Sequence, residues 1–351
     1  MRNYRWCFSV VAVAVVALML SSGLAFAADK GGELPVVKWR CQSAWPPPEE
    51  IIPGSIYKGG YGMVMEVARK VAEKTGGKFT IEVFTPNQLI KTKGILDALR
   101  SGAIDMAACN GAYFGGTIPS ANIECMSVGG ASDPTVFVPM LTESDWLKII
   151  RRDYAKFGVY YLTPEPAGTS LIMGNFGCDT VDCMKKYKIA ATGAKGDLFR
   201  ILGVSAVTVH STDIYPALQR GTIDAVMYSS YCLGTYKFHE VTKYAIWTEI
   251  QSPLLSNITC NLKSYESLPK AYQDILNEAA MEMAIRQLKG TNEIDNIARD
   301  LCVKHGIKQI TFEGEPKKQI RQAILQIWDK YAAMSEDNAQ LIKILRSYAG
   351  Y

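Results

Sequence analysis

Apolar side chains recur along the first third of the chain with two different periods. Short apolar or alternating runs, typical of strands, occupy residues 36–42, 79–84 and 104–108. Between the first two runs, Met63, Val67 and Val71 recur at every fourth residue, which predicts a helix over about 56–75, and a second helix is expected over 94–100. Strands that alternate with helices favour a mainly parallel sheet with right-handed crossovers, so this region predicts an α/β fold.

The same alternation returns in the second half of the chain. The expected strands there are residues 159–162, 170–173, 187–190 and 207–209. An amphipathic helix is predicted over 146–157, and a further helix should end at 202–203. Residues 188–227 therefore form another strand-helix-strand-helix-strand series. Two such blocks predict two lobes, and we place the second lobe at about 160–260.

Helical spacing dominates the C-terminal part, residues 269–351. A long helix is expected to begin at Leu268-Pro269, because proline suits the first turn of a helix. Its predicted apolar stripe is Ala271, Ile275, Ala279 and Met283. A final helical region over 316–348 places four apolar side chains on one face: Ile320, Ala323, Ile327 and Tyr331.

The first 27 residues have the pattern of a signal peptide. Arg2 and Arg5 form a basic start, residues 8–20 are an apolar run, and Ala25-Phe26-Ala27 is the small-x-small pattern at which signal peptidase cuts. The mature protein, residues 28–351, is therefore expected in the periplasm, and a retained N-terminal anchor is the alternative.

Charge and motifs exclude several classes of function. Lys and Arg number 38 and Asp and Glu 34, and without the two N-terminal arginines the balance is 36 to 34, so no nucleic-acid partner is predicted. The chain has no nucleophile elbow, phosphate-binding loop or HExxH motif, so neither an enzyme nor a cofactor is expected. Cys178 and Cys183 are close enough for a local disulfide, with buried thiols as the alternative.

Five segments carry a resemblance to a known family. They are residues 39–46 (WRCQSAWP), 84–89 (FTPNQL), 102–105 (GAID), 215–225 (YPALQRGTIDA) and 234–244. In this order they resemble the substrate-binding proteins of TRAP transporters, the tripartite ATP-independent periplasmic uptake systems. The resemblance is to the DctP family and, within it, most to the α-keto-acid branch.

The resemblance implies a two-lobed periplasmic binding protein fold, with hinge strands and a long bridging helix, that closes over one small organic solute. It also implies a membrane partner, a sodium-driven pair of permease subunits. Some members of the α-keto-acid branch form dimers through their C-terminal helices, so a homodimer through residues 320–348 is a further expectation. A diverged sensory or scaffold protein of the same fold is the alternative function, and an enzyme is a further alternative.

Three positions depart from the family pattern. Ala190 follows Lys188-Ile189, where most members carry an arginine that clamps the ligand carboxylate. Met227 and Tyr228 stand where the α-keto-acid branch has a carboxylate and an aromatic residue that help to bind a metal. Pro166 falls roughly where that branch has a glutamine. Both the arginine clamp and the metal ligands are therefore expected to be missing, and no metal is predicted.

Three explanations of these departures are open. The solute could lack a simple carboxylate, because a buried unpaired anion is costly. Another cation, Lys195, Arg200 or Lys237, could replace the arginine. The chain could also be a diverged receptor without a typical ligand.

The residues predicted to contact the solute are largely aromatic or apolar. They are Trp45, Tyr113, Glu165, Ala190, Met227, Tyr228 and Trp247, and Phe114, Tyr231 and Glu249 are further candidates. Aromatic rings beside a carboxylate would suit a cationic or neutral amphipathic solute.

Overall fold

The computed structural model describes residues 33–47, 59–125, 129, 133–209, 211–248, 250 and 253–350. The predicted signal peptide, His210 and Glu249 lie outside these residues. The chain divides into two compact units, Met1–Pro35 and Val36–Tyr351, and the fold below is that of the second unit. In the part of the chain that is described, no helix has the length and apolar character needed to cross a membrane.

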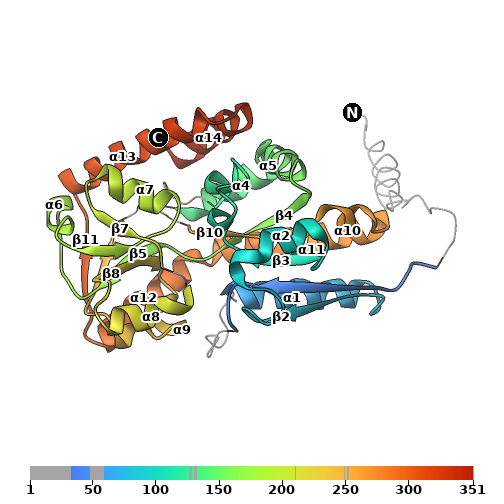
Figure 1. Cartoon of the computed structure of the whole chain (residues 1–351), viewed down its shortest axis with the longest axis horizontal. Coiled ribbons are helices and arrows are strands. Elements are labelled where there is room, and N and C mark those ends of the chain that lie inside the picture. Colours follow the sequence, from blue (N-terminus) through green and yellow to red (C-terminus); the bar gives the residue numbers. More distant parts are fainter. Residues whose placement is uncertain are drawn as a thin grey trace, which may run out of the picture. The chain divides into compact units, whose positions relative to one another are not determined.

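The first sheet has five strands in the order β2-β1-β3-β10-β4 (Figure 1). They are β1 (Val37–Ser43), β2 (Phe79–Phe84), β3 (Met106–Cys109), β4 (Val159–Pro166) and β10 (Leu255–Asn261). β1 runs parallel to β2 and β3, whereas β10 runs antiparallel to β3 and β4. Helices α1 (Gly59–Lys74) and α2 (Ile95–Ser101) connect the parallel strands, so the predicted β-α-β-α-β opening is confirmed.

The second sheet has six strands in the order β11-β9-β5-β8-β6-β7. They are β5 (Ser170–Gly174), β6 (Lys188–Ala190), β7 (Ser205–Val207), β8 (Ala225–Ser229), β9 (Tyr244–Trp247) and β11 (Lys308–Thr311). The predicted strand over 207–209 was wrong by two residues, because Ser205 to Val207 pair with β6. The predicted second lobe over about 160–260 overlaps this sheet without coinciding with it, since β4 and β10 belong to the first sheet.

The remaining elements are short helices and turns. They are α3 (Ala121–Glu124), α4 (Phe137–Glu143), α6 (Val181–Met184), α8 (Ser211–Gln219), α9 (Cys232–Thr235), α10 (Leu262–Glu266), η1 (Thr92–Gly94), η2 (Gly111–Tyr113), η3 (Pro134–Val136) and η4 (Phe238–Glu240). The predicted disulfide between Cys178 and Cys183 is present, and it closes a short loop around α6.

The predicted bridging helix is formed by two consecutive helices, α11 (Lys270–Lys289) and α12 (Thr291–Lys304), which meet at Gly290. α11 packs on α1 and β4 of the first lobe, and α12 packs on α9 and β11 of the second. The predicted stripe was wrong at its start: Ala271 is exposed, and Tyr272 is buried instead, with its ring 5.5 Å from that of Phe79. Pro269 precedes α11 as its N-cap residue and does not lie in its first turn.

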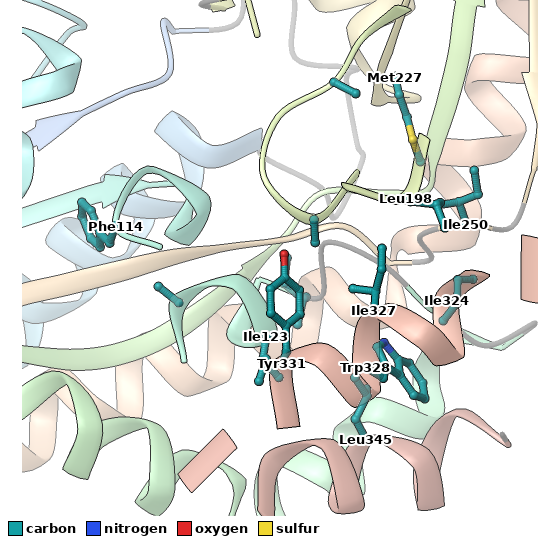
Figure 2. Packing of buried hydrophobic residues seen from close by; sticks show 14 of the residues in the cluster. Phe114, Ile123, Leu198, Met227, Ile250, Ile324, Ile327, Trp328, Tyr331 and Leu345 are labelled. Atoms are coloured by element: carbon teal, nitrogen blue, oxygen red, sulfur yellow. The ribbon is translucent and has the colours of Figure 1, made fainter. Parts of the chain in front are cut away.

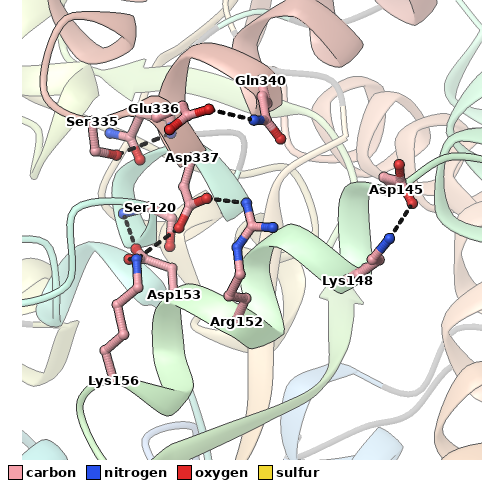
Figure 3. A network of polar contacts seen from close by, with 11 residues as sticks. Ser120, Asp145, Lys148, Arg152, Asp153, Lys156, Ser335, Glu336, Asp337 and Gln340 are labelled. Atoms are coloured by element: carbon pink, nitrogen blue, oxygen red, sulfur yellow. Dashed lines mark hydrogen bonds and ion pairs between the residues drawn. The ribbon is translucent and has the colours of Figure 1, made fainter.

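Two C-terminal helices also contact both lobes. α13 (Glu315–Ala332) packs on α7 (Ala194–Ile201) of the second lobe, and α14 (Glu336–Ala349) packs on α5 (Trp146–Ala155) of the first. Figure 2 shows Ile327 and Trp328 of α13 within a cluster of buried hydrophobic side chains. On α14, Asp337 forms ion pairs with Arg152 of α5 and with Lys156, the residue that follows α5 (Figure 3).

Candidate functional site

Residues from both sheets line one cavity. Six of the seven residues predicted to contact the solute are among them: Trp45, Tyr113, Glu165, Ala190, Met227 and Tyr228. Tyr231 also lines the cavity, and so do Lys195 and Ser256. A cavity enclosed by two α/β lobes is a common place for small-molecule binding. That these side chains contact a solute stays a prediction.

Two predicted residues lie elsewhere. Trp247 is buried in the second lobe, where its indole Nε1 donates a hydrogen bond to Gln309 at 3.1 Å and the Arg299 guanidinium lies 3.7 Å from the centre of its ring. Phe114 belongs to the core, edge-on to Tyr154. Both aromatic rings therefore pack against other residues of the protein and do not face the cavity.

The first lobe presents two aromatic side chains on tight turns. Trp45 follows β1, and the hydroxyl of Ser43 accepts a hydrogen bond from the Trp45 backbone N–H at 3.0 Å. Tyr113 ends the turn η2, whose first residue is Gly111. A Cβ at Gly111 would lie 1.6 Å from Oε1 of Glu124, so only glycine lets this turn pack so closely. Burial raises the pKa of Tyr113 to about 12, which keeps its hydroxyl a hydrogen-bond donor at neutral pH.

The second lobe presents Tyr228 from strand β8. Two rings pack edge-on against it, those of Tyr236 and Phe238, each with its centre 6.3 Å away. The Tyr228 hydroxyl oxygen is buried and has no hydrogen-bond partner among the residues that the structure describes. A buried hydroxyl without a partner is unfavourable, so this group is suited to bind a solute atom.

Lys195 brings a positive charge into the cavity. It is the second residue of α7, only 8% of its surface is exposed, and its Nζ atom lies 5.7 Å from the centre of the Tyr228 ring. No carboxylate among the described residues forms an ion pair with it. Burial lowers the pKa of Lys195 to about 8. The other two cations considered are elsewhere: Arg200 pairs with Asp197, and Lys237 is exposed beside η4.

Sequence reasoning named Lys195 only as one of three alternatives. The position of Lys195 in the sequence also indicates a place near a binding site. The residue follows the carboxyl end of β6 and opens the next helix, and ligands of α/β sheets bind at the carboxyl ends of strands.

Of the described residues that line the cavity, Glu165 is the one that carries a carboxyl group. Glu165 is 1% exposed, and its Oε1 has no hydrogen-bond partner within the described part of the chain. Burial raises the pKa of Glu165 well above its usual range, although hydrogen bonds from Gln287 and Ser256 act in the opposite direction. Gln287 lies on α11 and was not singled out from the sequence.

The sequence matches a known protein family. Residues 60–334 match the family model described as bacterial extracellular solute-binding protein, family 7. The chain belongs to this family. It is a periplasmic receptor that captures a small organic solute between two lobes and works with membrane permease subunits of the TRAP type.

Three relatives illustrate the range of solutes. The receptor is 26% identical to the monocarboxylate 2-oxoacid-binding periplasmic protein of Nostoc sp., over 93% of this chain and 87% of that one. A TRAP solute binding protein from Pseudoalteromonas atlantica, solved with sodium and pyruvate, has a TM-score of 0.77 and 22% identity, covering 90% of this chain and 94% of that one. Another from Chromohalobacter salexigens, solved with (S)-2-amino-1-propanol, has a TM-score of 0.74 and 20% identity, covering 90% and 96%.

Among the residues that line this cavity, one side chain carries the carboxylate that a metal ion such as the sodium of the Pseudoalteromonas protein prefers. Sodium and calcium prefer several oxygen ligands, carboxylates above all. Here the lining residues include one carboxyl group, Glu165, together with the thioether of Met227 and the ammonium of Lys195. Across the described part of the chain, no three His, Cys, Asp or Glu side chains gather as metal ligands.

Proposed function

We propose that this receptor captures a small organic anion and that Lys195 supplies the positive charge that binds its carboxylate. The observation that carries the proposal is the buried ammonium of Lys195, which lines the cavity without a carboxylate partner. The proposal chooses the second of the three explanations of the missing arginine, in which another cation takes its place.

Burial makes the charge of Lys195 costly. A charge removed from water costs several kcal/mol unless an opposite charge compensates it. This cost is expressed as the lowered pKa of Lys195. A solute carboxylate beside Nζ would offset the cost and favour the charged lysine. Lysine acts as a point charge, so it would bind the carboxylate without the bidentate geometry of an arginine.

The aromatic residues would enclose the rest of the solute. Trp45 and Tyr113 from the first lobe and Tyr228 from the second can contact a short carbon skeleton and exclude water when the lobes close. Met227 adds an apolar, adaptable contact. Capture by these groups needs no metal and involves no catalysis.

A homodimer through the C-terminal helices remains part of the proposal, with one restriction. Ile320, Ile327 and Trp328 are buried against the rest of their own chain. An interface would therefore use the opposite faces of α13 and α14. Sedimentation of the purified protein at micromolar concentration tests this part, and a monomer alone would contradict it.

Calorimetry with short organic acids tests the proposed solute class. The matched variants are Lys195→Met, which keeps much of the apolar stem but removes the charge, and Lys195→Arg, which keeps the charge. We expect Lys195→Met to lose at least about tenfold in affinity, as for a hydrogen bond to a charged group, and Lys195→Arg to retain more. Equal binding by wild type and Lys195→Met would contradict the proposal and would favour a neutral or cationic solute.

A further inference from the structure

A short segment of chain joins the two lobes beside the cavity. β4 ends in the first sheet and β5 begins in the second, so residues 167–169 form the crossing segment between them. Leu254, at the return from β9 to β10, pairs with this segment through two backbone hydrogen bonds, one from the Ala167 N–H at 2.8 Å and one to the Gly168 carbonyl at 2.7 Å. Any rotation of one lobe against the other has to be absorbed by backbone torsions in such connections.

A carboxylate on α12 holds the second-lobe end of the crossing segment. We propose that Asp295 is a positioning residue for solute capture, because it fixes this end and confines the bend between the lobes to Ala167 and Gly168. The residues that it fixes are Thr169 and Ser230. The inference goes beyond the proposed function, since it applies to any solute that the lobes enclose.

Three hydrogen bonds converge on the Asp295 carboxylate. Thr169 donates its backbone N–H to Oδ1 at 3.1 Å and its hydroxyl to Oδ2 at 2.5 Å. The Ser230 hydroxyl donates to Oδ1 at 2.6 Å, and the Ser230 backbone N–H donates to the Thr169 carbonyl at 2.8 Å. Hydrogen bonds to an ionised carboxylate are roughly twice as strong as those between neutral groups. Because both its backbone and its side chain are bound, Thr169 is held in one conformation.

The partners in these hydrogen bonds all belong to the second lobe. Asp295 lies on α12, which packs on α9 and β11, while Thr169 immediately precedes β5 and Ser230 immediately follows β8. Strands β5, β8 and β11 are members of the second sheet. The three hydrogen bonds therefore need not break when the lobes separate. They determine instead at which residue the rotation begins.

The residue before Thr169 is suited to bend. Gly168 has a φ of +73°, and a Cβ there would lie 2.8 Å from the Ser230 Oγ atom and 3.0 Å from the Ile294 Cγ2 atom. A side chain at this position would therefore collide with its neighbours, and glycine is also the residue with the widest range of backbone torsions. The most adaptable residue of the crossing segment is thus followed directly by one that Asp295 fixes.

Asp295 also affects the cavity without lining it. Ser230 lies between Tyr228 and Tyr231, and both tyrosines line the cavity. Ala167, at the other end of the crossing segment, lines it as well. One carboxylate outside the cavity thus holds the bend and the two tyrosines in a fixed relation. Groups that are ordered before the solute arrives lower the entropic cost of capture.

Pulsed EPR of the mature protein, freed of solute by unfolding, dialysis and refolding, measures the distribution of lobe orientations. Spin labels at Asp97→Cys on α2 and Gln219→Cys on α8 place one label on each lobe. Both positions are exposed, whereas the free cysteines that the structure describes are buried and should not react with the label.

Replacement of Asp295 by Ala should broaden the distribution of distances between the labels. Hydrogen exchange at the Thr169 amide should become at least about tenfold faster, as for loss of a hydrogen bond to a charged group. Asp295→Asn should stay close to wild type, because its amide oxygen can accept from the Thr169 N–H and the Ser230 hydroxyl while its N–H donates to the Thr169 hydroxyl.

A carboxylate that only stabilised α12 would give a different result. Its loss would lower the unfolding temperature and leave the distance distribution unchanged. The matched control is Ala298→Gly, which weakens the same helix without removing a hydrogen bond of Asp295. It should lower the unfolding temperature and leave the distribution as in wild type.

A second variant keeps the test decisive if Asp295→Ala does not fold. Thr169→Val combined with Ser230→Ala removes two of the three hydrogen bonds, leaves α12 unaltered, and should also broaden the distribution. An unchanged distribution in the folded variants that lack these hydrogen bonds would overturn the inference. Equal broadening in Ala298→Gly would overturn it as well, because lower stability alone would then explain the effect.

Discussion

The Nζ atom of Lys195 lies 5.7 Å from the centre of the Tyr228 ring, within the cavity that both lobes line. This contact joins a residue of α7 to a residue of β8. An ammonium over an aromatic face is attracted by the negative face of the ring, which partly compensates for its loss of water. The contact thus holds a positive charge inside the cavity until a solute anion arrives.

Binding of a carboxylate should weaken as pH rises. The pKa of Lys195 is about 8, and only the protonated form binds the anion strongly. Its protonated fraction falls from about 0.9 at pH 7 to about 0.1 at pH 9, so the apparent affinity should fall about tenfold. Calorimetry across this range measures the effect, and Lys195→Met is the control that should remove it. An affinity that is flat from pH 7 to 9 would contradict the role of Lys195.

Removal of metal ions should leave binding intact. The cavity offers one carboxyl group and a thioether, and its positive charge is already supplied by Lys195. Dialysis against a chelator, followed by titration in a buffer in which potassium replaces sodium, should change the affinity by less than about twofold, since no ion contributes a ligand bond. Loss of binding that calcium or sodium restores would show that a metal site exists here.

Replacement of Tyr228 should weaken binding in two measurable steps. Tyr228→Phe removes the hydroxyl that has no partner among the described residues, and Tyr228→Ala removes the ring as well. We expect about 1 kcal/mol of binding energy to be lost in the first variant and up to about 3 kcal/mol in the second. Trp247→Phe is a matched control, because Trp247 lies outside the cavity and should affect stability rather than affinity. Unaltered binding by Tyr228→Ala would exclude this ring from the site.

A buried carboxyl group beside the cavity should make stability depend on pH. Glu124 accepts hydrogen bonds from Tyr154 and Tyr161, each at 3.0 Å, and from Asn257 at 2.8 Å. Burial nevertheless raises its pKa from 4.5 to about 7. A raised pKa in the folded state gives stability that is present below pH 4.5 and is lost as pH rises through about 7.

The comparison of wild type with Glu124→Gln isolates this effect, because all other titrating groups are shared. The free energy of unfolding is measured with urea at pH 5 and at pH 8. Between these two pH values, wild type should lose on the order of 3 kcal/mol more unfolding free energy than Glu124→Gln does. A difference between the two proteins that does not change with pH would show that Glu124 titrates normally.

Much of the fold could be predicted because apolar periodicity is a local property of the sequence. The strand over 79–84 was predicted without error, as was the shared buried face of Ile320 and Ile327 on α13. The stripe of α11 was misplaced because Tyr272, whose ring packs on Phe79 from another element, decides which face is buried. Such a contact between distant segments leaves no periodic trace in the sequence.

The site could be predicted only in part, for a similar reason. Trp45, Tyr113 and Tyr228, predicted from loop or strand-end positions that resemble those of a known family, line the cavity, and their contact with a solute stays a prediction. Lys195 and Glu165 could not be ranked from the sequence, because their importance depends on burial and on missing partners, which only packing reveals. Trp247 is not among the residues that line the cavity, because this last residue of β9 packs against the guanidinium of the exposed Arg299 instead.

Mass spectrometry of the solute released from the purified, denatured protein tests the central claim most directly. The receptor closes over a single small molecule, so protein isolated from its source can retain that molecule. We predict an organic acid with at least one carboxylate, bound at one molecule per chain. A released solute that is neutral or carries only positive charge would contradict the assignment of Lys195 as the anion-binding group.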